Sequence, residues 1–122
     1  MITVFVDASA AIEPGAAARL GHLTDAGHRL VLVAPPDHPS ARAAGWTERR
    51  DSLPADPVRG SWYVTADPDS CGDRHADLRT ILIGPRVEIG PRGEGRRPTR
   101  CDTTARDLRE AVLQILAAEA MR

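Results

Sequence analysis

Lysine is absent from this chain of 122 residues, so all sixteen of its cationic side chains are arginines. Any mechanism that needs a lysine ammonium group is therefore excluded, and the planar guanidinium of arginine is not a simple replacement. The formal net charge is only -1 at pH 7. This balance gives no global reason to expect binding to nucleic acid or to a membrane surface.

Cysteines and long apolar runs are also scarce. The two cysteines, Cys71 and Cys101, are too few for a disulfide scaffold or a four-cysteine zinc site, and we expect both thiols to be free. No apolar run approaches the ~20 residues that a membrane-spanning helix needs, and the N-terminus lacks the pattern of a signal peptide. We therefore expect a cytoplasmic protein with no membrane attachment.

The clearest structural signal is the stretch Ile2 to Ser9, a β-branched and aromatic run that ends in Asp7 and two small residues. It predicts a buried strand that delivers Asp7 to the edge of a sheet. Residues 15–25 carry apolar side chains at helical spacing after Pro14. Residues 29–34 form a nearly continuous apolar run, typical of a strand covered on both faces. Together they predict a parallel, right-handed βαβ unit.

Further along, strands are predicted at 61–65 and 79–83, and a final helix is predicted from Asp102 or Thr103 to about Met121. Irregular loops are expected at about 35–60 and 86–100, where prolines, glycines or arginines replace any apolar period. The chain as a whole, 1–122, predicts a single α/β domain. Its expected architecture is a three-layer sandwich, with a Rossmann-like parallel sheet of four to five strands and helices on both faces.

Several segments resemble the haloacid-dehalogenase-like (HAD-like) hydrolases. Val-Phe-Val-Asp, followed by a Pro-Gly, helix, Gly and strand unit, resembles the opening of that family. Trp-Tyr-Val-Thr-Ala-Asp-Pro-Asp and Leu-Arg-Thr-Ile-Leu-Ile-Gly-Pro resemble its acidic turn and the strand after it. Ala-Arg-Asp-Leu-Arg-Glu-Ala-Val is similar to its terminal helix. The resemblance implies a small, capless HAD-like domain.

The resemblance also implies roles for individual carboxylates. In that family the first Asp of an Asp-x-Asp motif attacks phosphorus and binds Mg²⁺, and the second protonates the leaving group. Asp7 fits the nucleophile and metal ligand, whereas Ser9 stands at the general-acid position and is a poor acid at neutral pH. Asp67 aligns with the acidic turn as a second metal ligand, and Asp69 and Asp73 are close enough in sequence to assist.

The phosphate-binding positions depart from the family. Ala34 stands where a Ser or Thr hydroxyl would hold the phosphoryl group, and Arg42, Arg49 or Arg50 would have to replace the missing lysine. We therefore expect a domain that has lost phosphohydrolase activity, because phosphoryl transfer depends on positioning and charge neutralisation. It would instead bind a ligand, such as a small phosphorylated molecule, or a protein partner, including a second copy through the region of Trp46.

Two alternatives stay open. The first is a weak Mg²⁺-dependent phosphohydrolase in which Asp7 attacks, Asp67 holds the metal and an arginine replaces the lysine. The second is a PIN-like Mg²⁺-dependent ribonuclease, because Val-Asp-Ala-Ser-Ala and Val-Thr-Ala-Asp-Pro-Asp also resemble that family. A PIN domain needs a helix leading into the second motif, whereas residues 47–60 are proline-rich. The simplest interpretation of Asp7 is a polar residue that ends a strand and caps the turn after it.

Overall fold

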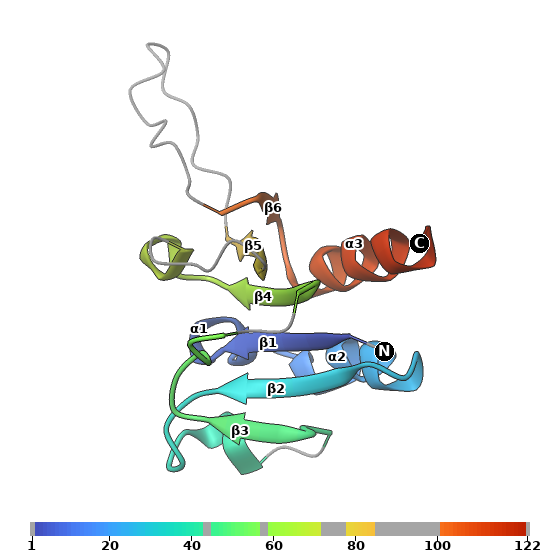
Figure 1. Ribbon diagram of the computed structural model, residues 1–122. Helices are drawn as coiled ribbons and strands as arrows, with labels where there is room; N and C mark the ends of the chain where they lie inside the picture. The colour runs from blue at the N-terminus through green and yellow to red at the C-terminus, as the bar shows by residue number, and fades with distance from the viewer. Residues whose placement is uncertain (1, 43–44, 57–58, 72–77, 85–100, 122) are drawn as a thin grey trace.

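The computed structural model of the protein describes residues 2–42, 45–56, 59–71, 78–84 and 101–121. Its central feature is a six-stranded sheet in the order β3-β2-β1-β4-β5-β6, in which all neighbouring strands are parallel (Figure 1). The strands are β1 (Thr3–Asp7), β2 (Arg29–Val33), β3 (Glu48–Arg50), β4 (Ser61–Thr65), β5 (Leu78–Ile83) and β6 (Thr103–Ala105). The predicted α/β sandwich with a Rossmann-like parallel sheet is confirmed, with six strands in place of four to five.

The two additional strands lie at the two edges of the sheet. β3 falls inside the segment that was expected to be an irregular loop, together with a 3-10 helix, η1 (Pro39–Arg42). Its sequence, Glu-Arg-Arg, is charged throughout and three residues long, so it lacks the alternation of apolar and polar residues that would predict a strand. The other expected loop, 86–100, lies outside the described residues.

The predicted start of the last helix is wrong, because residues 103–105 form strand β6. Residues 103–105 pair with β5, and helix α3 (Leu108–Ala120) begins only after Asp107, whose carboxylate accepts a hydrogen bond from the Glu110 amide at 2.9 Å. Asp102 holds this edge in place: its carboxylate accepts from the Thr80 amide at 2.9 Å, and its own amide donates to the Thr80 hydroxyl at 2.8 Å. Asp102 therefore secures a strand and does not cap a helix.

The described residues include three α-helices. α1 (Ala8–Ala11) follows β1 directly, and α2 (Ala16–Asp25) forms the predicted crossover to β2. α2 and α3 pack against each other and, with the same face of the sheet, bury a cluster that includes Val4, Val6 and Leu20. Within the described ranges, no helix combines the length and the apolar character needed to cross a bilayer.

The opposite face of the sheet buries a smaller cluster. Phe5, Val31, Val33, Tyr63 and Leu78 pack there, with partly buried Leu53 against them. Leu53 comes from the connection between β3 and β4. Within the described residues the α-helices contribute only to the larger cluster, whereas the prediction placed helices on both faces of the sheet. Because apolar side chains of β1 and β2 point to both faces, the continuous apolar runs in their sequences are explained.

A disulfide joins Cys71 to Cys101, whose Cα atoms are 5.2 Å apart. The expectation of free thiols is therefore wrong. Cys71 ends a second 3-10 helix, η2 (Pro68–Cys71), which follows β4, and Cys101 precedes Asp102 at the start of β6. Their separation of 30 residues conceals this proximity, which exists only because β4, β5 and β6 lie side by side.

Candidate functional site

The candidate site lies where the two central strands of the sheet end. The chain runs outward from β1 through β2 to β3, and then returns to place β4 on the other side of β1. Open α/β sheets bind their ligands in the crevice outside such a reversal of strand order. Asp7 ends β1 and Thr65 ends β4 at this crevice, and α1 stands over the end of β1 (Figure 1). The predicted position of Asp7 at the sheet edge is confirmed.

The Asp7 carboxylate is engaged by neighbours on both strands. Its Oδ2 atom accepts from the Ser9 amide at 3.2 Å, which caps α1, and from the Ser9 hydroxyl. The Thr65 hydroxyl donates to the same oxygen at 3.3 Å. A metal ion or an electrophile would therefore have to use Oδ1, because the hydrogen bonds to Oδ2 already satisfy it.

Thr65 stands at the centre of this arrangement and is fully buried. Its Oγ1 lies 3.3 Å from the Ser9 hydroxyl and accepts from the Asp67 amide at 3.1 Å. The Ala66 amide donates to Ser9 Oγ at 3.0 Å. We refer to Asp7, Ser9 and Thr65 together as the inter-strand latch, since their hydrogen bonds join the ends of β1 and β4. Sequence reasoning missed the role of Thr65, although its hydroxyl at the end of an apolar strand was visible.

Tyr63 lies two residues before Thr65 on the same strand and is almost completely buried. Burial, with a further contribution from the negative charge of Asp7, raises the pKa of Tyr63 to about 12. The phenol is therefore neutral at physiological pH, so it brings no second negative charge close to Asp7.

The fit of these residues to a Mg²⁺ ion is poor. Asp67 is exposed, and its Oδ2 accepts from the Ser70 hydroxyl at 3.2 Å. In the described part of the chain, no group of three or more His, Cys, Asp or Glu side chains could hold a metal ion. Mg²⁺ requires near-octahedral oxygen ligands, and one oxygen of Asp7 is already occupied. Asp73 and the side chain of Asp69, the other predicted carboxylates, lie outside the described residues.

Ala34 follows β2 at the same edge of the sheet, as predicted, and is buried. Of the three arginines proposed to replace the lysine, the structure brings Arg49 to it: Nη1 donates to the Ala34 carbonyl at 2.9 Å and pairs with Asp51 at 2.8 Å. Arg42 is exposed on η1, and Arg50 is 3.9 Å from Glu48. Arg49 is thus engaged with the backbone beside the latch.

An open hollow of about 280 Å³ lies beside the inter-strand latch. The residues that matter most to its chemistry are Ser9, Ile12, Glu13, Ala66, Gly84 and Arg106. Glu13 accepts from the Leu108 amide at 3.1 Å and so holds the start of α3. Arg106 is mostly exposed and pairs with Glu110 at 3.0 Å. This hollow combines a hydroxyl, an exposed cation and an apolar residue, Ile12, that is 66% exposed.

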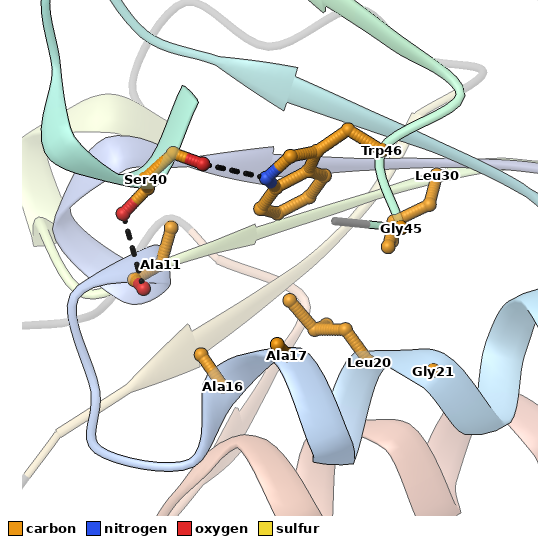
Figure 2. Close-up of a pocket in the computed structure, with 9 residues that line it drawn as sticks. All are labelled: Ala11, Ala16, Ala17, Leu20, Gly21, Leu30, Ser40, Gly45 and Trp46. Carbon is orange, nitrogen blue, oxygen red and sulfur yellow. Dashed lines mark hydrogen bonds between the residues drawn. The ribbon is translucent and has the colours of Figure 1, made fainter. Parts of the chain in front are cut away.

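A second cavity, of about 40 Å³, lies between Trp46 and α2. Figure 2 shows the indole of Trp46 across from Ala17 and Leu20, with its Nε1 donating to the Ser40 carbonyl at 2.7 Å. The Ser40 hydroxyl donates in turn to the Ala11 carbonyl at 3.3 Å. This cavity is far smaller than a typical ligand site, so its residues serve to anchor the connection that leads into β3.

Comparison of the chain with protein-family models, curated proteins and solved structures found no match. The resemblance to HAD-like hydrolases therefore remains an interpretation of sequence motifs.

Proposed function

We propose that this chain is a HAD-like ligand-binding domain that has lost phosphohydrolase activity and binds a small phosphorylated molecule in the hollow beside Ser9. The main support for the loss of activity is the hydrogen bonding of the Asp7 carboxylate. Its Oδ2 accepts three hydrogen bonds, two from Ser9 and one from Thr65. A carboxylate used in this way holds two strands together, and the hydrogen bonds to Oδ2 lower its nucleophilicity.

The surroundings of Asp7 support the same conclusion. Phosphoryl transfer needs positive charge at the transferring group, yet the chain has no lysine and Arg49 is engaged by the Ala34 carbonyl and Asp51. Ala34 supplies no hydroxyl for a phosphoryl oxygen. No particular contact favours the weak phosphohydrolase or the PIN-like ribonuclease, and no helix lies in the described residues between β3 and β4.

Arg106 is the cation best placed to hold an anionic ligand at the hollow. Its pairing with Glu110 is an exposed contact between a residue just before α3 and the first turn of that helix, and such ion pairs contribute little stability. The guanidinium can therefore exchange Glu110 for a phosphate group, with which it forms stronger, bidentate hydrogen bonds. The exposed Ile12 offers an apolar surface to the remainder of the ligand.

Ligand binding can be tested by recording ¹H–¹⁵N NMR spectra while inorganic phosphate and then glycerol phosphate are added without Mg²⁺. We expect saturable shifts of the Ser9, Ala66 and Gly84 amides. Arg106→Gln should weaken binding about tenfold, because a charge-assisted hydrogen bond is lost. Arg109→Gln, an exposed residue of α3 that does not line the hollow, is the matched control and should bind as the unaltered protein does. Absence of saturable shifts at these amides overturns the ligand proposal.

Loss of catalysis is tested separately with p-nitrophenyl phosphate and Mg²⁺. We expect no hydrolysis above the level given by Asp7→Asn. Hydrolysis that Asp7→Asn abolishes would instead establish the phosphohydrolase alternative.

A further inference from the structure

β3 forms one edge of the sheet, with β2 as its neighbour and no further strand beyond it in the described residues (Figure 1). An edge strand presents backbone N–H and C=O groups that another chain can pair with. Proteins often protect such edges with short strands, charged side chains, prolines or bulges. β3 is short and charged, but its charges are of both signs, on Glu48, Arg49 and Arg50.

The outward backbone groups of β3 belong to Arg49. The Arg50 carbonyl faces β2, since it accepts from the Ala34 amide at 2.9 Å. Neighbouring residues of a strand point their backbone groups to opposite sides. The N–H and C=O of Arg49 therefore face away from β2, at the open edge.

The segment before β3 is held firmly in place. The Thr47 amide donates to the Leu30 carbonyl at 2.7 Å, and the Thr47 hydroxyl accepts from the Leu30 amide at 3.1 Å. Trp46 is fixed to Ser40, as Figure 2 shows. An edge that is already ordered loses little conformational entropy when it pairs.

The charge pattern of β3 is self-complementary when two copies pair antiparallel. If two copies pair antiparallel about a two-fold axis at Arg49, Glu48 of each copy lies directly opposite Arg50 of the other. Opposite charges at such positions stabilise a strand pair. Within one chain Glu48 and Arg50 are only loosely paired, at 3.9 Å, and both side chains are 44% exposed. The facing Arg49 side chains are each compensated by their own Asp51, at 2.8 Å.

We propose that this protein forms a homodimer by antiparallel pairing of β3 with β3 of a second copy. The two Arg49 residues exchange both backbone hydrogen bonds, and two Glu48–Arg50 pairs form across the axis. The two sheets become one continuous sheet. Because the paired edge is short, the association is weak and depends on protein concentration. This inference is independent of the ligand proposed for the hollow.

Sedimentation velocity at protein concentrations up to about 1 mM tests the proposal in the range of weak association. We expect a reversible monomer–dimer equilibrium that weakens with added salt. Glu48→Arg alone and Arg50→Glu alone should each weaken dimerisation about tenfold, because like charges then face each other. The double variant Glu48→Arg/Arg50→Glu should restore it. Arg109→Glu, an exposed charge reversal on α3, is the control and should dimerise normally.

A second pair of variants tests the backbone contact and does not depend on charge. Arg49→Pro removes the outward N–H, which edge strands tolerate, whereas Arg49→Ala keeps it. We expect dimerisation to be lost in Arg49→Pro and kept in Arg49→Ala, with both variants folded by circular dichroism. A protein that stays monomeric at every concentration overturns the proposal. So does a dimer that survives both Arg49→Pro and the single charge reversals.

Discussion

Asp7 and Thr65 show how one carboxylate can join two strands. The Asp7 side chain is only partly exposed at the end of β1 and receives donors from its own helix and from β4. The position of Asp7 could be predicted from the sequence, because an apolar run that stops at a carboxylate marks a strand end. Its partner Thr65 could not, since the two are separated by 58 residues.

At the scale of single residues, we predict that Thr65→Val destabilises the protein by about 1–3 kcal/mol. This is the cost of leaving a buried polar group without its hydrogen-bond partner. The change keeps the volume of the side chain but removes a donor to Asp7 and the acceptor of the Asp67 amide. Urea unfolding measures the loss as a lower midpoint. Thr104→Val, at an exposed position of β6, is the control and should leave the midpoint unchanged. An equal midpoint for Thr65→Val would contradict the role of the latch.

Among the secondary-structure elements, the edge strands were hardest to predict. β1, β2, β4 and β5 have apolar sequences because their side chains are buried, and the predicted ranges of β2, β4 and β5 lie within one residue of the observed bounds. β3 and β6 are three residues long and carry few apolar side chains. They are strands because β2 and β5 offer them unpaired backbone groups, and this is a property of the sheet.

At the scale of the elements, we predict the effect of removing the disulfide that links the segment after β4 to the start of β6. Cys71→Ala/Cys101→Ala should lower the free energy of unfolding by about 3–4 kcal/mol, the loop-closure estimate for a separation of 30 residues. Thermal unfolding with and without dithiothreitol measures the effect. The reductant should lower the melting temperature of the unaltered protein and have no effect on the variant. If thiol titration of the unfolded, unreduced protein found two free thiols, the bridge would be refuted.

At the scale of the whole molecule, the two faces of the sheet differ in how much apolar surface they bury. The cluster beneath α2 and α3 is the larger, and Leu20 within it is almost fully buried. On the opposite face, the smaller cluster is covered in part by Leu53, which remains partly exposed. Most of the hydrophobic stabilisation therefore comes from the face that the two longer helices cover.

We accordingly predict that Leu20→Ala costs about 2–5 kcal/mol in the free energy of unfolding, as for leucines in closed cores. Leu53→Ala removes the same atoms from a partly exposed site and should cost roughly 1 kcal/mol. Guanidinium unfolding of both variants provides the comparison. Equal losses would show that the two faces contribute alike and that the loop carrying Leu53 closes a core of its own.

By itself, the sequence determined the fold class, the central strands and the delivery of Asp7 to the sheet edge. These features follow from which side chains are buried, and burial leaves a local period in the sequence. Tertiary structure alone decided that Cys71 meets Cys101, that Thr65 completes the latch with Asp7 and Ser9, and that Glu-Arg-Arg becomes an edge strand. Each of these depends on segments that only the folded sheet brings together, and no local pattern records which distant residue becomes the neighbour.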